Sequence, residues 1–67
     1  MEKRLENYFK RNNVEVRAGG EENIRIGFIP YEISEKVFRY LDKNGISYRR
    51  RYNHNYTIAI ATMRIQA

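Results

Sequence analysis

The sequence contains no cysteine and no tryptophan, and it has one proline and one histidine. Without cysteine the chain can build neither a disulfide framework nor a thiolate metal site, and a single histidine, His54, cannot complete a zinc site within one copy. No stretch approaches the roughly 18 apolar residues of a membrane helix, and the first residues lack the apolar core of a signal peptide. These absences predict a soluble, cytoplasmic protein without metal or cofactor.

What the chain does have is positive charge, distributed unevenly. The 67 residues carry a formal net charge of +5. Acidic and basic residues balance within residues 1–33, whereas residues 34–67 hold seven basic side chains against Glu35 and Asp42. The excess lies entirely in the second half, which favours a polyanionic partner. At this length we expect one domain, residues 1–67, whose core only just offsets the entropy of the chain.

The first half predicts a helix followed by a hairpin. Apolar residues recur at helical spacing within residues 2–12. In residues 14–17 and 24–28 they alternate instead with charged or small residues, as in strands buried on one face. The turn at 18–23 contains two adjacent glycines.

The second half predicts the same elements. Ser34 is expected as the N-cap of a helix that ends at Asn44-Gly45. Two strands follow, Ile46 to Tyr52 and Tyr56 to Met63, joined by the turn Tyr52-Asn53-His54-Asn55.

The two halves also match each other at an offset of 32 residues. The matches predict two αββ repeats, residues 2–29 and 34–61, neither of which could bury its apolar face alone. The matched residues are Leu5 with Val37, Tyr8 with Tyr40, Phe9 with Leu41, Asn12 with Asn44, Val14 with Ile46, Val16 with Tyr48, Arg17 with Arg49, Ile24 with Tyr56, Ile26 with Ile58, and Phe28 with Ile60.

These elements predict an α+β fold with both helices on one face of a four-stranded antiparallel sheet. The expected strand order is 1-2-4-3, because the second and fourth strands are the more apolar and belong in the centre. The arrangement is a permuted ferredoxin-like one. The αββαββ order resembles the core of the LAGLIDADG homing endonucleases, a family whose sheet saddles DNA. The resemblance implies no nuclease activity, since the chain has no LAGLIDADG-like helix with an acidic metal ligand.

Alternation along the strands predicts which residues face the helices. The expected inward set is Val14, Val16, Ile24, Ile26, Phe28, Ile46, Tyr48, Tyr56, Ile58 and Ile60. The opposite face would then carry Glu15, Arg17, Arg25, Gly27, Ser47, Arg49, Arg51, Thr57, Ala59 and Ala61.

The leading functional hypothesis is nucleic-acid binding, to DNA or RNA, through the basic second hairpin and the uncovered sheet face. Arginine matches phosphate oxygens in geometry, and aromatic rings near the turn can stack on bases. The residues assigned to this role are Arg17, Arg25, Arg49, Arg50, Arg51, Tyr52 and His54. A competing interpretation is that the arginines only protect an edge strand from pairing with another sheet.

The alternative hypothesis is a protein-interaction module, for example an accessory protein of a phage or mobile element. Small residues on an exposed sheet face would allow a second sheet or helix to approach closely, so homodimerisation is also an option. The candidate interface is Gly27, Thr57, Ala59 and Ala61.

No catalytic group is expected. His54 lies between two asparagines in a polar turn, where a lone histidine is usually a turn residue. Glu21-Glu22 has no further ligands nearby for a cation, and neither serine has a base beside it. The sequence therefore predicts a binding protein rather than an enzyme.

Overall fold

The computed structural model describes residues 3–65 as an αββαββ chain with one additional turn of helix. Its elements are α1 (Lys3–Arg11), β1 (Glu15–Ala18), β2 (Ile24–Pro30), the 3₁₀ turn η1 (Tyr31–Ile33), α2 (Ser34–Lys43), β3 (Ser47–Tyr52) and β4 (Ile58–Arg64). The strands form one antiparallel sheet in the order β1-β2-β4-β3. This confirms the predicted strand order, with the two more apolar strands in the centre.

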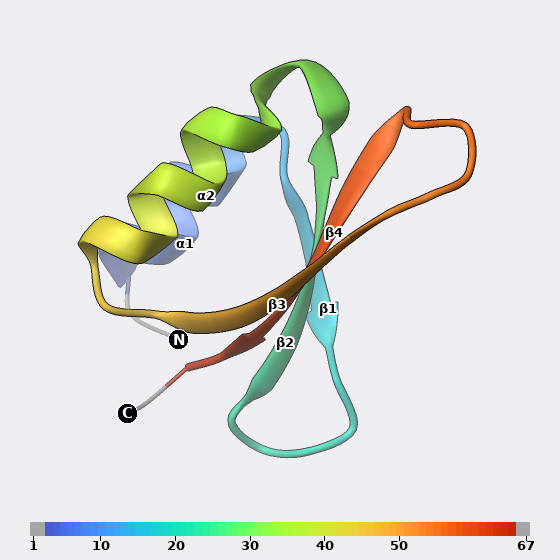
Figure 1. The fold of residues 1–67 in the computed structure, drawn as a ribbon. Coiled ribbons are helices and arrows are strands. Elements are labelled where there is room, and N and C mark those ends of the chain that lie inside the picture. Colours follow the sequence, from blue (N-terminus) through green and yellow to red (C-terminus); the bar gives the residue numbers. More distant parts are fainter. Residues whose placement is uncertain (1–2, 66–67) are drawn as a thin grey trace.

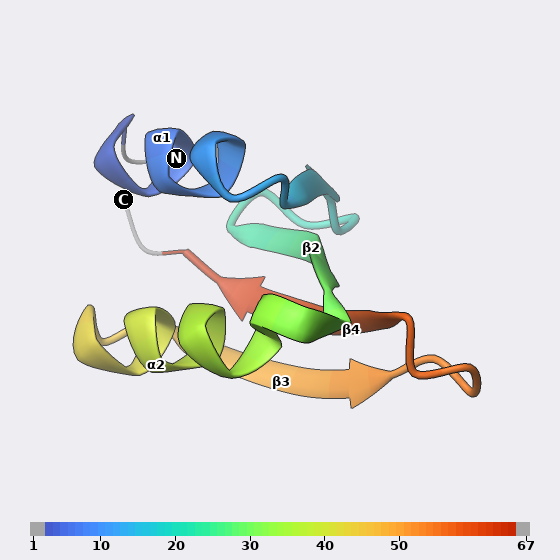
Figure 2. The ribbon, with the colours of Figure 1, turned by 90° about the horizontal axis from the view of Figure 1, so that it is seen from above.

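Both helices lie on one side of the sheet, and none of the described helices covers the other side (Figure 1). Seen from above, the helices run side by side, with α2 alongside β3 (Figure 2). At their facing surfaces, the rings of Tyr8 on α1 and Tyr40 on α2 stack with centroids 3.6 Å apart and planes 4° from parallel. The two tyrosines therefore join the helices directly.

The two helices end in the same way. Asn13 and Gly45 each adopt a positive φ, 59° and 68°, just after the helix. After α1, the Val14 N–H donates to the carbonyl of Phe9 at 2.9 Å. After α2, the Ile46 N–H donates to the carbonyl of Leu41 at 3.0 Å. These bonds satisfy carbonyls that would otherwise be left free at the helix end, and they turn the chain into the following strand.

The start of α2 differs from the sequence-based expectation. Ser34 was predicted as the N-cap, but it is the first helical residue, and Ile33 caps the helix without a side-chain hydrogen bond. The prediction was wrong because the chain enters α2 through η1. The Ser34 N–H donates to the carbonyl of Tyr31 in η1, so Ser34 already has a helical conformation. Ser34 is instead buried.

The helix-facing side of the central strands is built from small residues. Ala59 and Ala61 of β4 are 0% exposed, and Gly27 of β2 is also buried. A Cβ placed on Gly27 would lie 3.1 Å from Cε of Met63, which shows how closely the layers approach. Ile29 and Met63 fill the remaining space under the helices together with Phe9, Val37, Phe38 and Leu41.

The predicted faces of β2 and β4 are therefore wrong. Side chains alternate along a strand, so residues between the buried ones point away from the helices. The paired positions Phe28 and Ile60, and Ile26 and Thr62, belong to the uncovered face. Ile24 and Ile58 belong to it as well, whereas Val14, Val16, Ile46 and Tyr48 pack against the core as predicted. Gly27, Ala59 and Ala61 lie under the helices and do not form an exposed floor.

We expect substitutions at adjacent residues of β4 to lower the free energy of unfolding by different amounts. Ala61→Leu adds volume beneath the helices and should lower the free energy of unfolding by about 1–3 kcal/mol. Ile60→Thr keeps a β-branched residue on the uncovered face and should cost less than about 1 kcal/mol. Urea unfolding of both variants measures the difference. A larger loss in Ile60→Thr than in Ala61→Leu would restore the sequence-based face assignment.

A second expectation concerns alkaline pH. Burial, followed by the hydrogen bond that its hydroxyl donates to Asp42 at 2.9 Å, raises the pKa of Tyr48 above 10.0. The folded state favours the neutral phenol, so Tyr48 contributes to the free energy of unfolding. This contribution is complete below the pKa that Tyr48 has in the unfolded chain, and it is lost as the pH rises through the pKa of the folded state. In a titration followed by tyrosinate absorbance, Tyr48→Phe should remove a tyrosine that ionises at a higher pH than an unperturbed one. Loss of an early-ionising group instead would contradict the assignment.

Candidate binding surface

The surface opposite the helices, called here the open face, has an apolar centre. Five residues of the central strands form its apolar stripe: Ile24, Ile26 and Phe28 from β2, with Ile58 and Ile60 from β4. All five are partly exposed. Burial of the small residues on the other side of the same strands leaves these larger side chains uncovered, which is uncommon on a small isolated domain.

Arginines lie on both sides of the apolar stripe. Arg49 and Arg51 of the edge strand β3 are exposed and pair in register with Thr62 and Ile60. Neither forms a salt bridge with an acidic side chain in the described part of the chain. Arg17 lies on the opposite edge, in β1, and Arg64 is at the end of β4.

Arg17 is held in place by two contacts. Its guanidinium lies 2.7 Å from a carboxylate oxygen of Glu15 and 5.0 Å from the ring centroid of Phe28. Both contacts are on the open face, because Glu15 pairs with Phe28 and Arg17 with Ile26 in the sheet register. Glu15 is exposed, so its ion pair is screened by water and is easily exchanged for another anion.

Two of the arginines assigned to binding lie elsewhere. Arg50 points to the helix side, where its guanidinium is 3.4 Å from Glu35 and 4.9 Å from the ring centroid of Phe38. Arg25 pairs with Met63 on the helix side, and its Nη1 donates to the carbonyl oxygens of Glu22 and Ile24 at 2.7 and 2.9 Å. The run of three arginines is thus divided between the two faces by strand alternation.

Three tyrosines meet at the end of the sheet where η1 and the β3–β4 loop adjoin. The centroids of Tyr31 and Tyr52 are 5.5 Å apart, and each lies 6.2 Å from that of Tyr56. Tyr31 is 40% exposed and Tyr56 63% exposed. Tyr52 is more buried and approaches Glu35 through its hydroxyl, at 3.5 Å. This tyrosine cluster contains the largest exposed aromatic surface of the described chain.

Asn53 organises the loop that carries the cluster. Its Oδ1 accepts the Thr57 N–H at 3.1 Å, and its Nδ2 donates to the Thr57 hydroxyl at 3.0 Å. Tyr56 has a positive φ of 55°, so it lies in the loop and not in a strand as predicted. Thr57, assigned to a strand face, is also in the loop, and His54 is exposed there.

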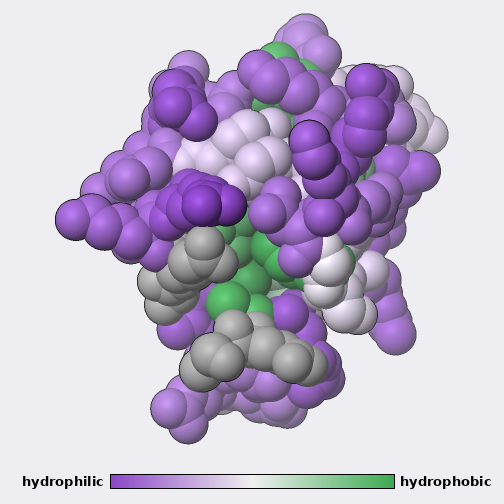
Figure 3. Space-filling view, turned by 90° about the vertical axis from the view of Figure 1, so that its left-hand side faces the viewer, coloured by the Kyte–Doolittle hydropathy of each residue, from purple (hydrophilic) through white to green (hydrophobic). Residues whose placement is uncertain are grey.

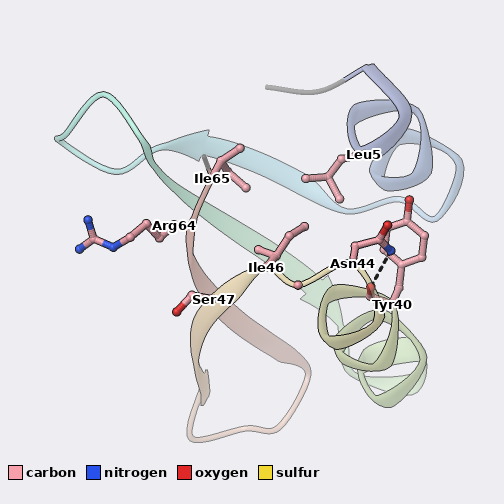
Figure 4. A pocket seen from close by; sticks show the side chains of 8 residues that line it. Leu5, Tyr40, Asn44, Ile46, Ser47, Arg64 and Ile65 are labelled. Atoms are coloured by element: carbon pink, nitrogen blue, oxygen red, sulfur yellow. Dashed lines mark hydrogen bonds between the residues drawn. The ribbon is translucent and has the colours of Figure 1, made fainter. Parts of the chain in front are cut away.

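A separate hollow opens at the opposite end of the sheet. It measures about 210 Å³, and three apolar side chains converge on it: Leu5 of α1, Ile46 just before β3 and Ile65 just after β4 (Figure 4). On this side hydrophobic surface is visible beside hydrophilic residues (Figure 3). The side chain of Arg64 points away from the hollow (Figure 4).

The open face and the tyrosine cluster present cationic and aromatic groups that can contact a ligand. No group of three His, Cys, Asp or Glu residues able to hold a metal occurs within residues 3–65. In the same range, no helix is long and apolar enough to cross a membrane. Arginine guanidinium groups, an apolar centre and exposed aromatic rings can together bind an anion that also carries flat apolar groups.

Sequence reasoning missed four features of this surface. It did not include Arg64, and it placed the apolar stripe under the helices. It also treated Tyr56 as a core residue and left Tyr31 without a role. The signal for Tyr31 was its position directly after Pro30, outside any periodic pattern.

No protein-family model, curated protein or solved structure matches the chain. The functional assignment therefore depends on the geometry of the open face and the tyrosine cluster.

We expect Asn53→Ala to loosen the tyrosine cluster. The variant loses two hydrogen bonds to Thr57 and should lower the free energy of unfolding by about 1 kcal/mol, with faster hydrogen exchange at the Thr57 amide. Asn55→Ala, in the same loop, is the matched control, because the described structure shows no hydrogen bond from its side chain. Equal effects of the two substitutions would exclude Asn53 as the organiser of the loop.

Proposed function

We propose that this protein is a small, non-catalytic nucleic-acid-binding module that uses its open face. The observation that carries the proposal is the pair Arg49 and Arg51, exposed and without an acidic partner in the described chain, beside an uncovered apolar stripe. Arg17 and Arg64 extend the positive charge around that stripe. Phosphates would bind at the arginines, and the tyrosine cluster would add rings at the end of the sheet.

The electrostatics of the face support an anionic partner. Among residues 3–65, four arginines and a single glutamate lie on it, so these side chains make the potential over the apolar stripe positive. Arg50 and Arg25 contribute less to this surface, because they are engaged on the helix side. Edge protection, the competing interpretation, explains charge on β3 but not the partly exposed Ile and Phe residues beside it.

We also propose that the fold consists of two αββ repeats in a permuted ferredoxin-like arrangement. The matched helix ends, and the stacking of the matched residues Tyr8 and Tyr40, support this interpretation. The pairing of β2 with β4 supports it too. Gly27 pairs with Ala61, and Ile29 pairs with Ala59. Because Gly27 matches Ala59 and Ile29 matches Ala61 at an offset of 32 residues, exchanging the two repeats turns one pair into the other. The two repeats would give one face two similar halves, with Arg17 and Arg49 as equivalent residues.

A second candidate function is docking on a protein. The aliphatic character of the apolar stripe favours it, since four of its five residues are isoleucines. Such a partner would need carboxylates around an apolar centre to complement the arginines. Gly27, Ala59 and Ala61 cannot contribute to the contact, because they are buried under the helices. A defined protein partner that survives nuclease treatment and is lost in Ile60→Arg would favour this function.

Three neighbouring arginines of β3 test the nucleic-acid proposal. Arg49→Gln and Arg51→Gln should each weaken binding to mixed DNA and RNA, and each should reduce the slope of log affinity against log salt by about 0.7–0.9. Arg50→Gln removes the same charge from the helix side and is the matched control, with little expected change in slope. Fluorescence anisotropy at several salt concentrations provides the measurement.

Three results would contradict the proposal. One is the absence of binding at about 50 mM salt, where phosphate contacts are strong. Another is an equal effect of Arg50→Gln and Arg49→Gln, which would make net charge alone responsible. The last is equally tight binding of polyglutamate, an anion without phosphates or bases.

A further inference from the structure

We propose that the open face selects single-stranded over double-stranded nucleic acid, with unpaired bases lying on the apolar stripe. This inference rests on the proposed nucleic-acid function and adds the physical form of the ligand. It depends on the arrangement of two kinds of surface, an apolar centre and a cationic border. A ligand that covers both must present flat apolar groups next to its phosphates.

The cationic border and the apolar centre lie side by side across the sheet. Neighbouring strands of a sheet are about 4.8 Å apart, so Arg17 on β1 and Arg49 on β3, which lie in one row of the register, are separated by roughly 14 Å across the sheet. Phe28 and Ile60 lie between these edges, paired with each other in the central register. A backbone that follows the β3 edge along Arg49 and Arg51 can therefore turn its bases inward over the apolar stripe.

A duplex does not meet this arrangement. The flat faces of its bases are stacked inside the helix, and only the base edges are accessible, at the bottom of the grooves between the sugar–phosphate backbones. Such a surface can contact the arginines, but it leaves Ile26, Phe28 and Ile60 against charged or hydrated groups. Unpaired bases can lay a whole flat face over these residues in place of water. The stripe therefore adds more affinity for single strands than for duplex.

Exposed rings extend the same path. Phe28 is the one aromatic residue of the stripe, and Arg17 lies over its ring. At the loop end of the sheet, Pro30 pairs with Ile58, and the next residue, Tyr31, donates its N–H to the carbonyl of Thr57 at 3.1 Å. The tyrosine cluster thus adjoins the loop end of the apolar stripe. The Tyr52 ring lies on the helix side, near Glu35, and the exposed rings of Tyr31 and Tyr56 offer surfaces on which further bases can stack.

A second copy of the chain fits this face less well. Two open faces brought together would oppose four arginines with four arginines, and within the described part of the chain each face has only Glu15 to offset them. Like charges placed opposite one another in an interface raise its free energy. A single strand brings the negative charge that the border lacks.

The test compares oligothymidine, which cannot pair with itself, with a mixed-sequence duplex of the same length. A length of about 12 nucleotides lies within the site sizes of known single-strand-binding surfaces, and the duplex is given the same number of base pairs. We expect the folded protein to bind oligothymidine at least about tenfold more tightly than duplex near 150 mM salt, because the stacking contribution is not screened as phosphate contacts are. Fluorescence anisotropy and competition between the two ligands measure the ratio.

The double variant Ile26→Thr/Ile60→Thr removes apolar surface and keeps β-branched side chains and charge. It should weaken oligothymidine binding about tenfold and leave duplex binding unchanged, so the duplex serves as the control for each preparation. Phe28→Leu, which keeps the site apolar and removes its ring, should act in the same direction. It provides the reading if the double variant does not fold.

The outcomes separate the two levels of the proposal. Equal affinity for the two ligands, or equal loss in the variants, would overturn strand selection and leave nucleic-acid binding intact. Absence of binding to either ligand at about 50 mM salt would remove nucleic-acid binding itself. A preference for oligothymidine that depends on Ile26, Ile60 and Phe28 supports both.

Discussion

The close approach of the helix layer to the two central strands is the constraint on which the rest of the structure depends. Ala59 and Ala61 are fully buried beneath the helices, and Gly27 has no room for a Cβ without displacing Met63. Small residues at these positions let the helices approach the sheet closely enough for the core to be densely packed. These three residues allow the rings of Phe9 and Phe38 to be buried against the sheet.

That constraint also produces the open face. Because neighbouring residues of a strand point in opposite directions, small residues beneath the helices leave Ile58 and Ile60 on the other side. The same alternation divides the three arginines of β3. Arg50 pairs with Glu35 and lies over Phe38, whereas Arg49 and Arg51 are exposed on the open face. One run of like charge thus has two structural environments.

The β3–β4 loop combines an unfavourable backbone conformation at Tyr56 with side-chain hydrogen bonds that stabilise the loop. Tyr56 holds a positive φ, which costs a non-glycine residue roughly 1–2 kcal/mol. The side chain of Asn53 offsets part of this cost through its two hydrogen bonds to Thr57. The result is a ring that is 63% exposed beside Tyr31, in a conformation that the loop enforces.

The sequence by itself determined the order of the elements, the ends of the helices and the central position of β2 and β4. Helical spacing, Asn13 and Gly45 after the helices, and the apolar runs were sufficient for this. Only the tertiary structure decided which side of β2 and β4 meets the helices. Both alternating sets of β4 are apolar, isoleucines on one side and alanines with Met63 on the other, so hydropathy alone cannot orient the strand. The space beneath the helices orients it, and that choice makes the larger side chains part of the binding surface.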